Sequence, residues 1–220
     1  MFIDPADNIR PAPLKFSPFK ALVVPRPIGW ITTQSADGVI NLAPFSYFNA
    51  CCDTPPCVMY CVNGRHKEGG VKDSLANVEE TGEFVCNLAT WDLRRQMNDT
   101  SAHVPRSVDE MRAVGLTAVP SVKVKPPRVA ESPAHFECRL IRTVELPSAN
   151  PAERHVMVLG QVIGIHLDER LISDGRVDVR KLKPVARLGY LDFAVVEDFF
   201  TMERPDDAYA EMKLPKVAAS

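Results

Sequence analysis

The strongest candidate for ligand binding is the tripeptide Lys72-Asp73-Ser74, at the start of a short helix predicted over residues 74–80. Unpaired backbone N–H groups and the positive end of the helix dipole gather at such a start, and both attract anions. With the ammonium of Lys72 and the hydroxyl of Ser74, they predict a phosphate-binding site. The alternative is purely structural: Asp73 or Ser74 caps the helix, and Lys72 is solvated.

A second group of polar residues could supply further phosphate donors. Thr32 and Thr33 lie near the end of the first predicted strand, Arg26 lies in the rigid sequence Pro25-Arg26-Pro27, and Arg65 lies in a glycine-bearing loop. Hydroxyls at a strand end can bind phosphate oxygens, although threonine is also simply a common strand residue. Together with the helix start, these residues have enough donors for one dianionic phosphate.

A third candidate is the segment Asn41-Leu42-Ala43-Pro44-Phe45-Ser46-Tyr47-Phe48-Asn49. A proline within a strand removes one ladder hydrogen bond and bends the strand. The backbone groups exposed by such a bend can bind a planar heterocycle, and the aromatic rings nearby offer flat apolar walls. The alternative is an aromatic core strand with a bulge. A flat, phosphorylated cofactor would use both this segment and the helix start.

Other kinds of chemistry find no support in the sequence. GxGxxG, GxxxxGK[ST], GxSxG and HExxH motifs are absent, so neither a nucleotide-binding turn nor a common hydrolase site is predicted. The five histidines lack paired spacing; His66, between Arg65 and Lys67, is the best single candidate for an anion site. The six cysteines are predicted to be buried free thiols, because no CxxC pair indicates metal. We therefore assign no catalytic side chain and no metal ligand.

The elements that must position these residues are mostly strands. Nineteen prolines in 220 residues disfavour a helical architecture. Hydrophobic patterning predicts strands over residues 28–34, from 39 onward, and over 57–63, 83–89, 135–146, 155–166 and 193–202. Helices are predicted over residues 74–80, 92–98 and 107–114, the last with Ser107 as its cap and Glu110 at the capping-box position. Strands with inserted short helices favour a closed antiparallel barrel.

The composition limits the possible classes of protein. Lysine and arginine total 26 against 28 acidic residues, a net charge of −2, which argues against binding nucleic acid or anionic lipid through a positive surface. No apolar stretch approaches the roughly 20 residues that cross a bilayer, and residues 1–5 do not resemble a secretory signal. We expect a cytoplasmic protein with no membrane or nucleic-acid partner, folded as a single domain over residues 1–220.

Several short strings of residues occur in the chain in a particular order and spacing. Together they indicate a protein family much more specifically than any one of them alone. They are Pro25-Arg26-Pro27-Ile28-Gly29-Trp30-Ile31-Thr32-Thr33, Asp37-Gly38, Asn41 to Phe48, Asp53-Thr54-Pro55-Pro56, Lys72-Asp73-Ser74-Leu75-Ala76-Asn77, Thr81-Gly82-Glu83-Phe84-Val85, Met97-Asn98 and Leu188-Gly189-Tyr190. Through these strings, the chain from about residue 15 to about residue 195 resembles the flavin reductase-like family of FMN-binding split barrels, which includes flavoredoxins.

The resemblance implies a mainly β fold, namely a six-stranded antiparallel Greek-key split barrel with short helical decorations. It also implies a homodimer with non-covalent FMN near the subunit interface. Thr32, Thr33, Lys72 and Ser74 would then hold the phosphate, and residues 41–48 would line the isoalloxazine. The full set of candidate cofactor-binding residues is Thr32, Thr33, Asn41, Ala43, Pro44, Phe45, Ser46, Phe48, Asn49, Arg65, Lys72 and Ser74. Where the family often has threonine, Ser74 keeps the hydroxyl, whereas Tyr190 replaces a frequent glycine.

The function that follows is an FMN-dependent oxidoreductase, with NADH or NADPH as its reductant and free flavin or another molecule as its electron acceptor. The missing nucleotide-binding turn is consistent with a nicotinamide that only stacks transiently on the flavin. Two alternatives stay open at this point. One is an FMN electron-transfer protein of the flavoredoxin type without a nicotinamide site, and the other is a barrel that binds a different ligand or none.

Overall fold

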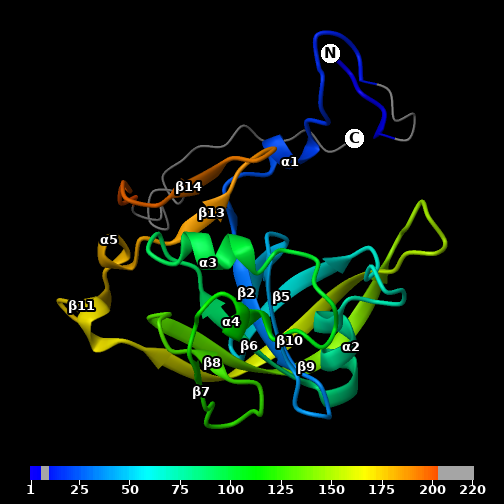
Figure 1. Cartoon of the computed structure of the whole chain (residues 1–220). Helices are drawn as coiled ribbons and strands as arrows, with labels where there is room; N and C mark the ends of the chain where they lie inside the picture. The colour runs from blue at the N-terminus through cyan, green and yellow to red at the C-terminus, as the bar shows by residue number, and fades with distance from the viewer. Residues whose placement is uncertain (6–9, 203–220) are drawn as a thin grey trace, which may run out of the picture.

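The computed structural model describes residues 1–5 and 10–202 of the chain, and its largest element is a seven-stranded antiparallel sheet (Figure 1). The order of its strands is β3-β2-β6-β9-β10-β5-β4. In chain order they are β2 (Gly29–Gln34), β3 (Ile40–Phe45), β4 (Phe48–Asp53), β5 (Pro56–Asn63), β6 (Glu83–Leu88), β9 (Ala134–Leu146) and β10 (His155–Leu167).

The prediction of a mainly β, antiparallel barrel is confirmed, but the strand count of six is corrected to seven in the main sheet. The reason lies between β3 and β4, which are consecutive in sequence and yet form opposite edges of the sheet. Ser46 and Tyr47 divide them, and the Tyr47 carbonyl accepts a hydrogen bond from the Cys61 amide of β5. Pro44 is tolerated in β3 because β3 is an edge strand with one free side.

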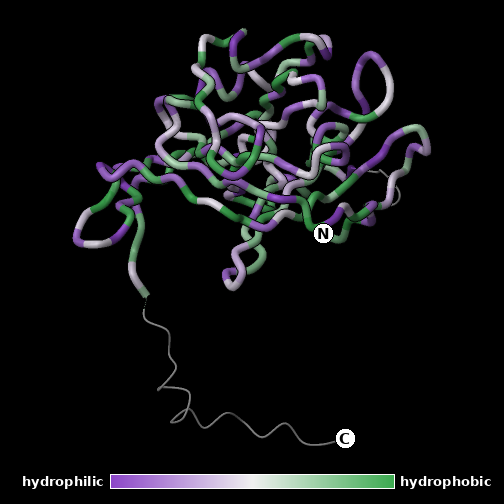
Figure 2. Tube along the Cα trace, turned by 90° about the horizontal axis from the view of Figure 1, so that it is seen from below, coloured by the Kyte–Doolittle hydropathy of each residue, from purple (hydrophilic) through white to green (hydrophobic). Residues whose placement is uncertain are grey.

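Strand β2 is buried on both faces, which explains why residues 29–33 read as one buried run instead of an alternating pattern. One face belongs to a hydrophobic cluster around Ile31, Tyr60 and Phe84. The other face belongs to a second cluster around Trp30 and Met97. Seen from below in Figure 2, the tube coloured by hydropathy has apolar and polar residues interspersed along the chain.

The first cluster brings the Phe84 ring against the backbone of Gly160 in β10. A Cβ at position 160 would lie 2.3 Å from Cζ of Phe84 and 3.3 Å from the carbonyl oxygen of Arg139. We therefore expect Gly160→Ala to lower the free energy of unfolding by about 1–3 kcal/mol, because the buried ring must move. Gly164→Ala, in the same strand with its nearest neighbour at 3.4 Å, is the matched control. Equal stability of the two variants in urea unfolding would contradict this packing.

Three helices lie near the candidate site: α2 (Asp73–Thr81), α3 (Arg94–Asp99) and α4 (Glu110–Ala113). Helix α2 ends at Gly82, whose φ of 72° is left-handed and suits glycine. Helix α4 is shorter than predicted, and its cap is Asp109, whose carboxylate accepts a hydrogen bond from the Arg112 amide. The prediction of Ser107 and Glu110 as a capping box was wrong, because Glu110 turns toward β3 instead.

A smaller three-stranded sheet forms an arm above the barrel in Figure 1. It consists of β1 (Arg26–Pro27), β13 (Val185–Arg187) and β14 (Phe193–Val195), with α1 (Phe19–Leu22) beside it. The predicted strand over 193–202 is therefore much shorter than expected. The remaining short elements are β7 (Ala118–Val119), β8 (Arg128–Val129), η2 (Glu169–Leu171), β11 (Ile172–Ser173), β12 (Arg176–Val177) and α5 (Val179–Leu182).

Arg26 holds this arm together instead of serving as a phosphate donor. Its side chain is buried, and its guanidinium donates to the carbonyls of Lys20 and Val23 at 2.5 Å each and of Leu188 at 2.8 Å. The guanidinium also lies over the ring of Tyr47, with its carbon 6.0 Å from the ring centroid. Arg26 thus joins α1 and the loop after β13 to the turn between β3 and β4.

Two expectations about the rest of the chain can be compared with the structure. All six cysteines are free thiols, but Cys51 and Cys52 are exposed and Cys61 is half-buried, so the prediction of burial is confirmed for the other three alone. Over residues 1–5 and 10–202, no helix is both long and apolar enough to span a membrane. The single domain over 1–220 stays a prediction, since residues 203–220 lie outside the described part.

Candidate functional site

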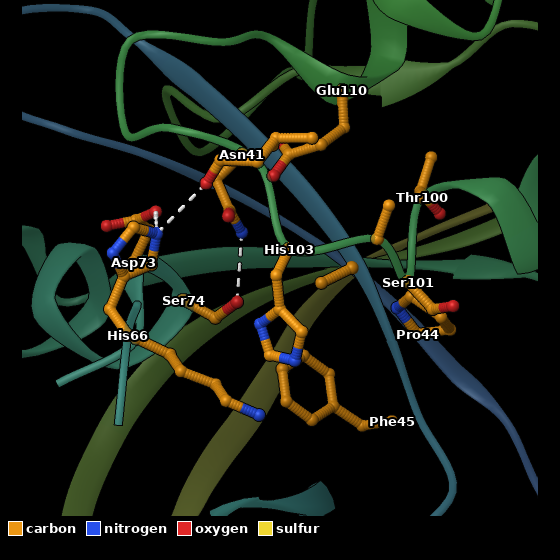
Figure 3. A pocket seen from close by; sticks show the side chains of 14 residues that line it. Asn41, Pro44, Phe45, His66, Asp73, Ser74, Thr100, Ser101, His103 and Glu110 are labelled. Atoms are coloured by element: carbon orange, nitrogen blue, oxygen red, sulfur yellow. Dashed lines mark hydrogen bonds and ion pairs between the residues drawn. The ribbon is translucent and has the colours of Figure 1, made fainter. Parts of the chain in front are cut away.

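The two segments singled out from the sequence meet at one cavity of about 100 Å³ (Figure 3). Strand β3, the start of α2 and the loop after α3 form its walls. Its lining residues are Asn41, Ala43, Pro44, Phe45, His66, Lys72, Asp73, Ser74, Thr100, Ser101, Ala102, His103, Val104 and Glu110. The kinked strand and the cationic helix start are therefore neighbours in space, although about 30 residues separate them in the chain.

Asn41 links β3 directly to the start of α2. Its Nδ2 atom donates to Oγ of Ser74 at 2.9 Å, as the dashed line in Figure 3 shows, and lies 3.4 Å from Oγ1 of Thr33. Asn77 of α2 donates to the same Thr33 oxygen at 3.1 Å. Because the oxygen of Ser74 already accepts a hydrogen bond, its own proton is left for a ligand.

Lys72 is the cation of the cavity. It is the N-cap residue of α2, and no side chain hydrogen-bonds to the first turn of that helix. Within the described residues its ammonium has no hydrogen bond or ion pair, and partial burial lowers its pKa. A half-buried cation beside an uncapped helix start is an electrostatic arrangement that an anion would stabilise.

Asp73 does not cap the helix either, because its carboxylate faces the loop before it. One oxygen pairs with Nη1 of Arg106, whose Nη2 donates to the carbonyls of Gly69 at 2.7 Å and Val71 at 2.8 Å. The other oxygen lies 3.6 Å from Nε2 of His66. The charge of Asp73 is thus used in closing this loop, and the capping alternative predicted for Asp73 or Ser74 was wrong.

His66 is a buried residue whose hydrogen bonds define its tautomer. Its Nδ1 accepts from the Glu68 amide at 3.1 Å, so the proton lies on Nε2, which donates to the Val104 carbonyl at 3.1 Å. The imidazole therefore connects the loop before α2 to the loop after α3. It lines the cavity, but both of its nitrogens are engaged.

The candidate residues predicted from the sequence divide into three groups. Those that line the cavity are Asn41, Ala43, Pro44, Phe45, Lys72 and Ser74. Ser46 lines a smaller cavity that shares Pro44 and Ser101 with the first. Phe48 packs against the core and beside Gly29.

The third group does not reach this cavity. Thr32 and Thr33 are fully buried in β2, where their hydroxyls accept from Asn87 at 2.8 Å and from Asn77 at 3.1 Å. They are buried because both faces of β2 are covered. Asn49 and Arg65 are exposed, and Oδ1 of Asn49 accepts from its neighbouring Ala50 amide.

Residues from the loop after α3 were missed by the sequence analysis. Thr100, Ser101 and His103 line the cavity, and the Met97-Asn98 string directly before them was the only signal pointing to this region. Partial burial and the nearby ammonium groups of Lys72 and Lys67 lower the pKa of His103. Because its pKa lies below the ordinary value of 6.5, this imidazole is mainly neutral at pH 7.

Glu110 is the other missed residue, and it is buried at the wall of the cavity. Its Oε2 accepts from the Leu42 amide of β3 at 3.0 Å, a donor that faces away from β2. Burial raises the pKa of Glu110 to about 7 despite this hydrogen bond. The cavity is therefore more positive below pH 7, where Glu110 is protonated, than above it.

We expect the raised pKa of Glu110 to appear in the pH dependence of stability. A carboxyl with an ordinary pKa of 4.5 and a native pKa of about 7 disfavours folding once it ionises. Its contribution is present below pH 4.5 and is lost as the pH rises through 7, with a total of about 3 kcal/mol. The free energy of unfolding of Glu110→Gln, relative to the wild type, should therefore rise by about this amount between pH 5 and pH 8, as measured by urea unfolding.

The exposed Glu80→Gln on α2 is the control for this pH dependence, because it removes a carboxylate of the same chemistry from solvent. Its stability should follow the wild type at both pH values. If Glu110→Gln also followed the wild type, the burial of this carboxyl would not perturb its ionisation as described.

The donor set of the cavity fits the phosphate end of FMN. One ammonium, the hydroxyls of Ser74 and Ser101 and an uncapped helix start surround it, and such donors are the usual partners of a phosphate monoester. Pockets for whole ligands typically enclose about 300–1,000 Å³. A cavity of about 100 Å³ therefore suits the phosphate, with the rest of the molecule extending beyond it.

Comparisons with known proteins agree with this fold. Residues 21–181 match the family described as the flavin reductase-like domain. An uncharacterised protein of Aquifex aeolicus is 38% identical over 169 residues, covering 76% of this chain and 83% of the relative. Another, from Halalkalibacterium halodurans, is 33% identical and covers 83% and 87%.

Solved structures extend the likeness to most of the chain. Nitrilotriacetate monooxygenase component B from Bacillus cereus has a TM-score of 0.82 and 29% identity, covering 92% of this chain and 98% of that one. A 2-nitrobenzoate 2-nitroreductase from Pseudomonas fluorescens has a TM-score of 0.74 and 26% identity, covering 91% and 92%. Flavoredoxin of Desulfovibrio vulgaris, at 22% identity, a TM-score of 0.70 and coverage of 82% and 91%, shares the fold.

Proposed function

We propose, because this chain belongs to the flavin reductase-like family, that it is an FMN-dependent oxidoreductase that uses NADH or NADPH as its reductant. The observation that carries the proposal is the junction of β3 with the start of α2. There an unpaired, half-buried Lys72 and a Ser74 hydroxyl held by Asn41 lie on one cavity. This is a site for a phosphate, and FMN is the phosphorylated flavin that barrels of this family bind.

Each residue at the junction has a physical part in holding the phosphate. The ammonium of Lys72 would neutralise one phosphate charge, and the first amides of α2 would stabilise the remainder through the helix dipole. The hydroxyl of Ser74 would donate, since Asn41 occupies its acceptor position. Ser101, across the cavity, would supply a further hydroxyl.

The walls beyond the phosphate are suited to a flat ring. Pro44 and Phe45 of β3 line the cavity, and Pro44 also lines the adjoining one with Ser46. When bound, FMN would supply the redox chemistry, namely a hydride acceptor for the nicotinamide at N5 and a source of electrons for free flavin or another acceptor. Glu110, whose pKa of about 7 lies nearest to neutrality, is the side chain of this cavity best placed to take up or release a proton near neutral pH.

Anaerobic stopped-flow mixing tests the proposed reaction. The purified, FMN-loaded chain is mixed with NADH or NADPH, and loss of the flavin absorbance near 450 nm on the order of seconds or faster is the expected result. If neither nucleotide bleaches a bound flavin, the chain is an electron-transfer protein of the flavoredoxin type. A colourless chain that takes up no added FMN would instead support a barrel for another ligand.

We also propose that the chain acts as a homodimer in the cytosol. Several large apolar side chains of the arm are exposed, among them Phe19, Leu22 and Leu191. Burying such residues against a second copy would gain stability through the hydrophobic effect. Sedimentation equilibrium should give twice the mass of 24.4 kDa, and a concentration-independent monomer would contradict the proposal.

A further inference from the structure

A second and larger cavity lies beside α3, on the side of the arm. Its volume is about 560 Å³, which is within the range of pockets for small organic molecules. Arg94 and Arg95 of helix α3 supply one wall, together with Trp91, which lies three residues before the helix. The arm supplies the other wall through Arg187, Leu191 and Phe193. We call this cavity the arginine groove.

The arginine groove adjoins a third cavity, which in turn adjoins the cavity lined by Lys72 and Ser74, here called the phosphate cavity. A small cavity of about 110 Å³ shares Pro44 and Ser101 with the phosphate cavity. The same small cavity shares Met97, Arg187 and Phe193 with the groove. A ligand in the groove would therefore lie next to whatever extends from the phosphate cavity along Pro44.

The charge of the groove is strongly positive. Arg94, Arg95 and Arg187 line it against a single acid, Asp99. Over the residues that the structure describes, none of these three arginines takes part in an ion pair. Burial and the neighbouring Arg26 lower the pKa of Arg187. A nearby anion would stabilise the charged guanidinium and so offset both effects.

The groove also offers flat apolar surfaces. The Arg94 guanidinium lies 3.8 Å from the Trp91 ring centroid, and Arg187 lies 4.3 Å from that of Phe193. Each guanidinium has one hydrogen bond, to the carbonyl of Trp91 or of Tyr190, which leaves most of its five donors free. Trp91 and Phe193 are 43% and 38% exposed, so ring area remains for a ligand.

We propose that the arginine groove binds the second substrate of the proposed oxidoreductase, and that this substrate is a planar organic anion. The ring of the substrate packs against Trp91 and Phe193, and its carboxylate or phosphate pairs with Arg94 and Arg187. That the ligand is a substrate follows only if the proposed oxidoreductase function is correct. That the groove binds a planar anion does not depend on that function. Two sources share this chemistry: a free aromatic acid and the phosphates of a nicotinamide dinucleotide.

The test uses the full chain loaded with FMN and two isosteric probes, 2-naphthoate and its neutral amide. Calorimetry should show that naphthoate binds roughly 10-fold or more tightly than naphthamide, because charge-assisted hydrogen bonds distinguish them. Naphthoate should also quench tryptophan fluorescence through Trp91, since the other tryptophan, Trp30, is fully buried. A Trp91→Phe variant should lose this quenching.

Arg94→Ala with Arg187→Ala should remove the preference for naphthoate, whereas Arg176→Ala, an exposed arginine of β12, should not. NADPH is titrated in parallel, and loss of its binding in the same double variant identifies the dinucleotide as the source. If the double variant binds both naphthoate and NADPH as tightly as the wild type does, the inference is overturned.

The outcome for FMN separates this inference from the proposed function. The double variant should keep its FMN affinity within about twofold, because Lys72 and Ser74 lie in the other cavity. A wild-type chain that fails to bind FMN contradicts the proposed function. If FMN binds normally but the double variant binds naphthoate and NADPH as tightly as the wild type does, only the inference about the groove is contradicted.

Discussion

Replacing Lys72 and Ser74 together by alanine should weaken FMN binding by about 2–5 kcal/mol, or roughly 30-fold to several thousand-fold in Kd. The ammonium and the hydroxyl are the two side-chain donors at the start of α2 that line the cavity. Removing them leaves a dianionic phosphate with the helix dipole and Ser101 alone. The fold should persist, because neither donor belongs to the two hydrophobic clusters.

Titration of the FMN-free chain with FMN, followed by quenching of the flavin fluorescence, measures this effect. Lys67→Ala is the matched control, because it removes a cation of the same type from the exposed part of the neighbouring loop. Its Kd should stay within a few-fold of the wild type, since an exposed charge is screened. A double variant with the wild-type Kd would mean that the phosphate binds elsewhere.

Glu137→Ala should lower the free energy of unfolding by about 3–5 kcal/mol. Glu137 of β9 is fully buried, and its carboxylate accepts from the Val122 amide at 2.8 Å, the Lys123 amide at 2.5 Å and Nε2 of His166 at 2.5 Å. Burial alone would raise its pKa, but these hydrogen bonds outweigh burial and lower it. The alanine variant loses all three bonds and leaves a space in the barrel wall.

Urea unfolding at pH 7 measures the loss, and Glu169→Ala in the exposed helix η2 is the control. The native carboxylate stabilises the fold above its ordinary pKa of 4.5, and this contribution disappears as the pH falls through the lowered native pKa. The difference between wild type and Glu137→Ala should therefore shrink in acid. A variant as stable as the wild type at pH 7 would contradict the account of this carboxylate.

His135 adds to acid sensitivity from the neighbouring position on the sheet. Burial lowers its pKa to about 4, so the native state holds it neutral while the unfolded chain protonates it near pH 6.5. Its contribution to stability is complete above pH 6.5 and is lost as the pH falls toward 4. His135 and Glu137, both on β9, therefore each contribute stability that is lost in acid.

The long strands and helix α2 could be predicted from sequence because their signals are local. β9, β10 and β5 begin and end within one residue of the predicted bounds, and Gly82 marks the end of α2. The split of residues 40–53 into β3 and β4 could not be predicted. It depends on the hydrogen bond from the Cys61 amide to the Tyr47 carbonyl, which joins residues 14 positions apart and forms only in the folded chain.

The candidate site shows the same division. Lys72, Ser74 and residues 41–45 could be identified because their chemistry is visible in short strings. Thr32 and Thr33 have the same hydroxyl chemistry, but covering both faces of β2 places them in the core. Conversely, the sequence predicts Glu110 as a capping-box residue, and only the position of the Leu42 amide explains why it turns inward.

The most direct measurement compares FMN with riboflavin, which differ only in the phosphate, on the wild type and on the Lys72→Ala, Ser74→Ala chain. The wild type should bind FMN at least roughly 30-fold more tightly than riboflavin, and the double variant should lose most of this preference. Wild-type protein that binds riboflavin as tightly as FMN would contradict the assignment of this cavity to the phosphate. So would a preference for FMN that is as large in the double variant as in the wild type.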